Sequence, residues 1–256
     1  MNAANNIGQK QVIWIVGGSS GIGLALAEGL LQQGLCVVVS ARRIEALQTL
    51  AERFPESIQC VPVDVTEPST LKDGLSAILA HWGQLDRVIL NAADYAPMSL
   101  DDFDPALFER LMRINFMGVI HGIDAVRGHF LAQGAGEIII TASVAGFRGL
   151  PNAAPYGATK AALINMAESL APEFAQRGVA LRVINPGFVR TPLTDKNDFE
   201  MPGIIEPEEA ARLIIRKLNR SGFELLVPTG FGLVMKLIRI LPYRLFFALT
   251  RRMLKK

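Results

Sequence analysis

The sequence has few cysteines and almost no net charge. Its 256 residues include only two cysteines, Cys36 and Cys60, which lie in apolar runs and have no CxxC or Cys/His spacing. That pattern excludes a disulfide framework and a thiolate metal site, so we expect two reduced core cysteines and no bound metal. The formal net charge is +2, which gives no global field for nucleic acid, and we expect none as a partner.

The amino terminus lacks a long apolar stretch. Its first ten residues, MNAANNIGQK, are polar and do not resemble the apolar region of a secretory signal. We therefore expect a cytoplasmic protein. Half of all residues are apolar, which is enough to bury a sizeable core in a chain of this length.

Short runs rich in valine and isoleucine alternate with helical patterns along the chain. The runs cover residues 11–18, 35–41, 58–65, 86–93, 136–143, 179–187 and 223–228, and the helical patterns cover 22–33, 43–53, 68–82, 104–132, 156–177 and 207–220. Continuous apolar runs suit strands that are buried on both faces of a parallel sheet. The alternation predicts an α/β fold with a single doubly wound (Rossmann) sheet of about seven parallel strands and helices on both faces.

A glycine-rich stretch, VGGSSGIG at 16–23, follows the first apolar run and opens a helical segment. Gly17 permits a tight turn, Gly21 lets backbone N–H groups approach a pyrophosphate, and Gly23 allows close packing of helix on strand. The amino end of the helix then favours the anion. Any tight strand-to-helix turn can use glycine, but the position directly after the first strand favours a dinucleotide site.

Two arginines stand near the end of the second run, in SARR at 40–43. A dinucleotide fold that selects NAD normally places an acid about 20 residues beyond the glycines, on the ribose hydroxyls. Here Arg42 or Arg43 could instead hold a 2′-phosphate through charge-assisted hydrogen bonds. The alternative is that both arginines only solvate the start of a helix. The pattern predicts NADP (as NADPH) rather than NAD.

Seven short elements occur in order: GxxxGxG, DVT at 64–66, NAA at 91–93, Asn115, Ser143, YGATK at 156–160 and PG at 186–187. In this order and at these intervals the chain resembles the short-chain dehydrogenase/reductase family, from residue 10 to about 228. Departures are Val16, where the family often has Thr, and Ala93, where it commonly has Gly; both concern packing of the cofactor loops. The resemblance implies a cofactor site made of Gly17, Ser19, Ser20, Gly21, Ile22, Gly23, Arg42, Arg43, Asp64, Val65, Asn91, Ala92, Ala93, Tyr156, Lys160, Pro186, Gly187, Val189 and Thr191.

Asn115, Ser143, Tyr156 and Lys160 match the catalytic set of that family. The resemblance implies that Tyr156 is the general acid/base, that Lys160 bonds the nicotinamide ribose, that Ser143 donates to the substrate oxygen and that Asn115 helps hold a water. The i,i+4 spacing puts Tyr156 and Lys160 on one helical face. An ammonium about 4 Å from the phenol would be worth roughly 4 kcal/mol at an effective dielectric of 20, so we expect it to lower the pKa of Tyr156. Taken alone, such a pair is usually an ordinary surface pair.

The expected function is an NADP-dependent oxidoreductase that acts on CH–OH groups and moves a hydride between the nicotinamide and a carbonyl or secondary alcohol. An apolar substrate is expected because an irregular stretch at 188–206, a candidate lid within a domain of residues 1–230, carries Phe188, Leu193, Phe199, Met201, Ile204 and Ile205. The alternative is a nucleotide-binding or membrane-associated binding protein with this fold and little turnover. The family resemblance also implies a homodimer or homotetramer, because the helix carrying Tyr156 usually lies in a subunit interface.

Residues 231–256 form a basic extension beyond the shared core. From residue 225 onward there are seven lysines and arginines and no acid, which leaves 19 basic against 24 acidic residues in the first 224. Interrupting charges and Pro242 argue against a transmembrane helix. The pattern predicts an amphipathic segment that either lies on an anionic bilayer or packs on the protein or a neighbouring subunit.

Overall fold

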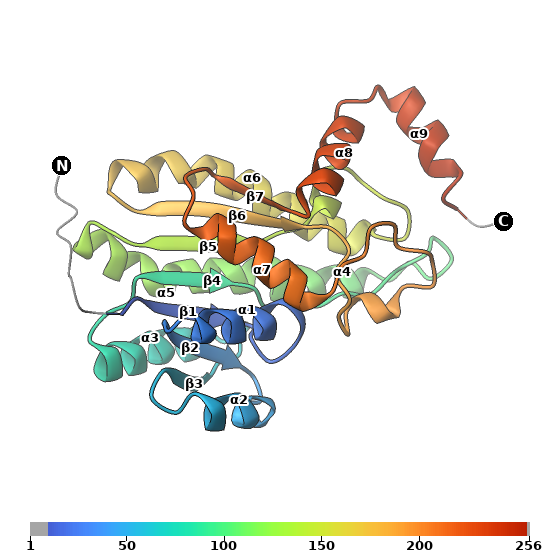
Figure 1. Ribbon diagram of the computed structural model, residues 1–256. Helices are drawn as coiled ribbons and strands as arrows, with labels where there is room; N and C mark the ends of the chain where they lie inside the picture. The colour runs from blue at the N-terminus through green and yellow to red at the C-terminus, as the bar shows by residue number, and fades with distance from the viewer. Residues whose placement is uncertain (1–9, 255–256) are drawn as a thin grey trace.

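The structure, a computed structural model, describes residues 10–254 and is built on one seven-stranded parallel sheet (Figure 1). The strand order is β3-β2-β1-β4-β5-β6-β7, and every neighbouring pair is parallel. This confirms the predicted doubly wound α/β fold. The strands are β1 (Val12–Val16), β2 (Cys36–Ala41), β3 (Ile58–Pro62), β4 (Arg87–Leu90), β5 (Glu137–Thr141), β6 (Ala180–Pro186) and β7 (Glu224–Val227).

Helices cover both faces of the sheet. In Figure 1, α1 and α7 lie in front of it and α5 and α6 behind it. The helices are α1 (Gly21–Gln32), α2 (Gln48–Arg53), α3 (Pro68–Trp82), α4 (Pro105–Leu111), α5 (Gly118–Gln133), α6 (Ala154–Gln176), α7 (Pro207–Leu218), α8 (Thr229–Arg239) and α9 (Tyr243–Arg251).

Each face of the sheet has its own hydrophobic core. Along β1, Trp14 points into the core shared with α3, α5 and α6, whereas Ile13 and Ile15 point into the core shared with α1 and α7. All five residues of this strand are buried. Burial on both faces explains why the apolar runs show no alternation of polar and apolar residues.

One predicted helix is three elements in the structure. The pattern at 104–132 is divided into α4, a π-helical turn at Met112–Met117 and α5. A π-helical turn inserts extra residues without ending the helix, so the apolar periodicity alone does not reveal it. The turn contains Asn115, which is fully buried.

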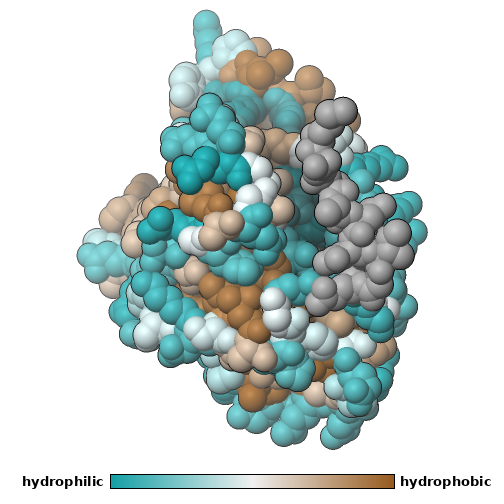
Figure 2. All heavy atoms as spheres, turned by 90° about the vertical axis from the view of Figure 1, so that its left-hand side faces the viewer, coloured by the Kyte–Doolittle hydropathy of each residue, from teal (hydrophilic) through white to brown (hydrophobic). Residues whose placement is uncertain are grey.

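The site end of the molecule is the edge where the strands finish, on the right of Figure 1. The strand order reverses between β1 and β4, and ligands in open α/β sheets bind at the carboxyl ends of the strands at such a point. Figure 2 shows the opposite face, toward the amino ends of the strands. It is covered largely by hydrophilic residues, with apolar ones near its middle.

The extension at 231–256 contributes most of α8 and all of α9, which rise above the carboxyl edge of the sheet (Figure 1). The turn between them is held by Arg148, whose guanidinium donates to the carbonyls of Ile238, Arg239 and Leu241 at 3.1, 2.8 and 2.5 Å. The same guanidinium lies over the ring of Phe246, 4.1 Å from its centroid. None of the helices within residues 10–254 combines the length and apolarity needed to cross a bilayer.

Candidate active site

A cleft of about 1580 Å³ opens at the carboxyl edge of the sheet. Typical ligand pockets measure about 300–1,000 Å³, so this cleft has room for more than one drug-sized molecule. Its walls come from the glycine loop, the ends of β2, β4, β5 and β6, the 188–206 segment, and α8 and α9. The predicted site residues that line it are Gly17, Ser19, Ser20, Gly21, Ile22, Arg42, Asp64, Val65, Asn91, Ala92, Ala93, Ser143, Tyr156, Lys160, Pro186, Gly187, Val189 and Thr191.

The glycine loop has the shape that a dinucleotide cradle needs. Gly17 has φ +92°, and a Cβ there would lie 2.5 Å from the backbone of Ala92. A Cβ on Gly23 would lie 2.1 Å from the carbonyl oxygen of Gly17, so Gly23 permits close packing of α1 rather than lining the cleft. The amide of Asn91 donates to the same carbonyl at 2.8 Å and braces the loop. The backbone of the loop and the amino end of α1 therefore fit a pyrophosphate.

The two predicted arginines are placed differently. Both are exposed, but only Arg42, beyond the end of β2, lines the cleft. Nearby, Asp64 accepts hydrogen bonds from the backbone N–H and the hydroxyl of Thr66 at 2.9 and 2.7 Å. The backbone hydrogen bond from Thr66 is the main reason that the pKa of Asp64 is lowered, and the charge of Arg42 adds to it. The cleft thus presents both a cation and an ionised carboxylate beside the glycine loop.

Three of the four predicted catalytic side chains meet in the cleft. Tyr156 and Lys160 project from α6, and Ser143 follows β5 and lies beside them. The ammonium of Lys160 is 5.5 Å from the centroid of the Tyr156 ring. Lys160 is only 1% exposed and donates to the carbonyl of Thr141 at 2.8 Å. Lys160 is therefore buried at the base of the cleft and Tyr156 is partly exposed in its wall, so the two do not form an ordinary surface pair.

The pKa values of this pair depend mainly on burial. Desolvation raises the pKa of Tyr156 to about 12, and a hydrogen bond with Ser143 partly opposes that rise. Desolvation lowers the pKa of Lys160 to about 7. The expectation that Lys160 lowers the pKa of Tyr156 is wrong, because the structure gives the opposite direction. Burial disfavours the charged form of each group, and this desolvation is the largest cause of both shifts.

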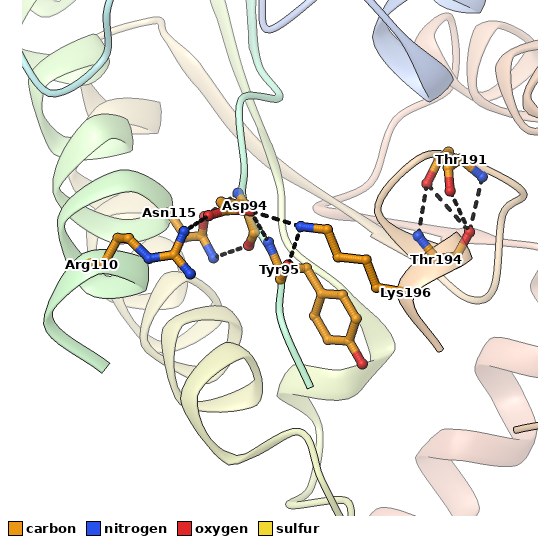
Figure 3. Close-up of polar contacts among 7 residues, drawn as sticks. All are labelled: Asp94, Tyr95, Arg110, Asn115, Thr191, Thr194 and Lys196. Atoms are coloured by element: carbon orange, nitrogen blue, oxygen red, sulfur yellow. Dashed lines mark hydrogen bonds and ion pairs between the residues drawn. The ribbon is translucent and has the colours of Figure 1, made fainter. Parts of the chain in front are cut away.

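Asn115 is the fourth predicted residue, and its side chain does not line the cleft. Its amide oxygen accepts from the N–H of Asp94 at 2.7 Å, and its amide nitrogen donates to the carbonyl of Asp94 at 2.9 Å (Figure 3). A weaker contact at 3.3 Å reaches the hydroxyl of Thr159 on α6. In this structure the side chain of Asn115 therefore fixes the loop that follows β4 against α6.

The residues after the NAA motif belong to the site, although the sequence did not point to them. In Figure 3, Arg110 and Lys196 approach the carboxylate of Asp94 from opposite sides, at 2.5 and 3.3 Å. Lys196 also donates to the carbonyl of Tyr95 at 2.6 Å. The ring of Tyr95 packs edge-on against that of Tyr156, with 5.1 Å between centroids. The one available signal is that Tyr95, one of three tyrosines, lies two residues beyond the NAA motif.

The 188–206 segment is anchored at its base. Val189 and Ile205 form a bridge between its two ends. The hydroxyl of Thr194 accepts from the N–H of Thr191 at 2.9 Å (Figure 3). It also donates to the carbonyl of Val189 at 2.8 Å. These bonds hold Thr191 against the glycine loop, where a Cβ on Gly21 would lie 2.7 Å from its methyl group. The base of the segment is thus built into the cleft wall.

Comparisons with known proteins show the family of this chain. Residues 11–201 match the family model described as short chain dehydrogenase. An uncharacterized oxidoreductase of Staphylococcus epidermidis is 34% identical over 212 residues, which cover 83% of this chain and 92% of the relative.

Two solved structures share the fold. A short-chain dehydrogenase/reductase from Burkholderia phymatum in complex with NAD is 23% identical with a TM-score of 0.81, covering 89% of this chain and 92% of the other. A variant of actinorhodin polyketide ketoreductase solved with NADPH is 25% identical with a TM-score of 0.77, covering 87% and 97%. Since the family model spans most of the chain and the cleft holds the residues of its motifs, the chain belongs to the short-chain dehydrogenase/reductase family of oxidoreductases.

Proposed function

We propose that this oxidoreductase uses NADP(H) to interconvert a carbonyl compound and a secondary alcohol, with Tyr156 as general acid/base. The observation that carries the proposal is the meeting of Tyr156, Ser143 and Lys160 in one cleft with a glycine loop. When bound, the nicotinamide supplies or accepts the hydride. The remaining work, which is to orient the substrate oxygen and to move a proton, falls to side chains of this chain.

In the reducing direction, Tyr156 gives the proton. With a pKa of about 12, the phenol is protonated at neutral pH and is available as a donor. Ser143 supplies a second hydroxyl at the place where negative charge develops on the substrate oxygen. Lys160, with a pKa of about 7, can take up or release a proton near neutral pH. We therefore propose that Lys160 both fixes the nicotinamide ribose and returns a proton to Tyr156, with the water held near Asn115 as the intermediate carrier.

The preference for NADP over NAD rests on Arg42. It is the predicted arginine that lines the cleft, at the position where an NAD-selective site would place an acid. The related structures include one solved with NAD and one with NADPH, so the fold itself is compatible with either.

An apolar substrate is proposed from the composition of the cleft beyond the catalytic residues. Phe188, from the 188–206 segment, contacts both Phe199 and Phe231, with centroids 5.9 and 5.7 Å apart. Side chains of α8 and α9 extend this apolar wall. We propose that residues 188–206 act as the substrate lid of a domain spanning residues 1–230.

Two further features of the function are proposed on other grounds. A homodimer or homotetramer follows from the usual role of the α6 helix in this family, and sedimentation equilibrium would measure it. A cytoplasmic setting fits the two free thiols, Cys36 and Cys60.

The experiment that tests the reaction is a screen of ketones, β-keto esters and long-chain acyl carbonyls, with NADPH and NADH absorbance followed in parallel. We expect turnover of at least one class, with NADPH preferred. Tight NADPH binding without turnover of any substrate would instead favour a nucleotide-binding protein with this fold.

A further inference from the structure

We propose that α8 and α9 form a docking surface for an anionic lipid bilayer. The first observation is the concentration of exposed apolar side chains on these helices. Of fifteen large apolar residues exposed among residues 10–254, ten lie between 233 and 254. They are Leu233, Val234, Leu237, Ile240, Tyr243, Leu245, Phe247, Leu249, Met253 and Leu254.

The outer side of α8 is apolar. Met235 is buried and marks the inner side of the helix. At 100° per residue, Leu233, Leu237 and Ile240 lie on the opposite side, and they are 52%, 64% and 76% exposed. No part of residues 10–254 covers this ridge. Apolar side chains left on an outer helix face in this way mark an interaction surface.

The neighbouring helix, α9, turns cations outward. Phe246 and Thr250 are buried and mark its inner side. Arg244, Arg251 and Arg252 lie on the other side of the helix by the same geometry, and all three are exposed. An apolar ridge beside a cationic one is what an interfacial segment needs, because the apolar side chains enter the acyl boundary while the cations meet anionic headgroups.

The charge of residues 225–256 selects an anionic bilayer as the occupant over a second copy of the protein. Residues 225–256 hold seven basic residues and no acid. A twofold dimer through this surface would place the same patch on both subunits and so bring arginines against arginines. An anionic bilayer offers the opposite charge. The length of α8 also fits a role at the membrane surface. The helix has 11 residues and spans only about 16 Å, which is too short to cross a membrane.

Docking would connect the lipid surface to the site. The inner sides of the same helices line the cleft through Met235, Ile238 and Phe246. A carbonyl compound dissolved in the bilayer would then have a short apolar path to Tyr156. This last step rests on the proposed function, whereas docking itself does not.

The test is co-sedimentation of the full-length protein with vesicles of phosphatidylcholine alone and of phosphatidylcholine mixed with phosphatidylglycerol. We expect binding to the anionic vesicles that weakens with added salt. The triple variant Arg244→Glu/Arg251→Glu/Arg252→Glu should bind at least about tenfold more weakly. A second variant, Leu233→Ser/Leu237→Ser/Ile240→Ser, should lose binding with its charge unchanged.

Matched controls come from elsewhere on the surface. Arg212, Arg216 and Arg220 are exposed on or beside α7, and their reversal to Glu changes the net charge by the same amount. Leu100→Ser/Phe103→Ser removes exposed apolar side chains outside the extension. Both controls should sediment like the wild type, and thermal melts and NADPH binding would show that every variant is folded.

Three outcomes would overturn the proposal. The first is that the wild type does not bind anionic vesicles. The second is that the α7 control variant weakens vesicle binding as much as the α9 variant does. The third is that the wild type associates with itself in the absence of vesicles and that the apolar variant of α8 abolishes this association. The last would assign the surface to a second copy. Because vesicle binding needs no substrate, it can fail or succeed independently of turnover.

Discussion

The hydroxyl of Tyr95 donates a hydrogen bond to the side-chain oxygen of Asn197 across 2.6 Å. These residues lie 102 positions apart, one in the loop after β4 and the other in the 188–206 segment. Since the ring of Tyr95 also rests edge-on against Tyr156, one side chain contacts both the proposed lid and the proposed acid. We therefore expect the position of the proposed lid to be coupled to that of Tyr156.

Removing that hydroxyl tests the coupling. Tyr95→Phe keeps the ring contact and loses one hydrogen bond, worth about 1 kcal/mol or roughly a fivefold effect. We expect a several-fold higher KM with kcat little changed, and faster proteolysis within 188–206 in the absence of substrate. Tyr243→Phe, at an exposed tyrosine outside the lid, is the control. If both variants are cut at the wild-type rate, Tyr95 does not hold the lid.

The second prediction concerns Tyr156 itself. Phe fills nearly the same space, so Tyr156→Phe should fold and bind NADPH as the wild type does. It removes the proton donor, and we expect turnover to fall by more than about a hundredfold at every pH. Steady-state rates and NADPH fluorescence titration measure the two properties separately. Substantial remaining activity in this variant would show that another group supplies the proton.

The sequence predicted well what depends on residues close together in the chain. The alternation of apolar runs and helical patterns was sufficient for the parallel sheet, and α3 spans the predicted residues 68–82. The glycine loop and the Tyr156/Lys160 pair are also local patterns, since one turn or one helix face contains each of them. Their meeting in one cleft follows from the order of strands in a doubly wound sheet.

What the sequence did not predict arises from tertiary packing. The contact of Asp94 with Lys196 joins residues in different loops, and neither residue belongs to a recognisable motif. The π-helical turn around Asn115 continues the helix on both sides, so no helix-ending signal marks it in the sequence. The direction of the Tyr156 pKa shift depends on how far the phenol itself is desolvated, which spacing along a helix does not reveal.

Burial of Lys160 predicts a pH-dependent stability. The pKa of Lys160 is about 7 in the folded protein, whereas an ordinary lysine, as in the unfolded chain, has a pKa of 10.5. Below pH 7, Lys160 is protonated in both the folded and the unfolded state, and the folded state carries the full cost of a buried charge. Between pH 7 and 10.5 only the unfolded chain keeps the proton, so the free energy of unfolding rises with pH. Lys160→Met removes this dependence.

We therefore expect Lys160→Met to be more stable than the wild type at pH 6, with the advantage shrinking by about 2 to 3 kcal/mol by pH 9. Urea unfolding of the cofactor-free protein at several pH values measures it. Lys72→Met, at an exposed lysine of α3, should show a difference that stays flat over this range. A constant gap for Lys160→Met would mean that Lys160 keeps its proton in the folded protein.

Cofactor choice gives a prediction with a control at the next position. Arg42 lines the cleft and Arg43 does not, although both are exposed and carry the same charge. A charge-assisted hydrogen bond to a 2′-phosphate is worth about 1.5–3 kcal/mol, or roughly 10- to 150-fold in affinity. Arg42→Ala should weaken NADPH binding by about that factor and leave NADH binding nearly unchanged, because NADH has no 2′-phosphate. Arg43→Ala should change neither, and isothermal titration of all three proteins with both cofactors measures each case. If Arg43→Ala weakens NADPH binding as much as Arg42→Ala does, the effect is a general one of surface charge and Arg42 is not the residue that selects the phosphate.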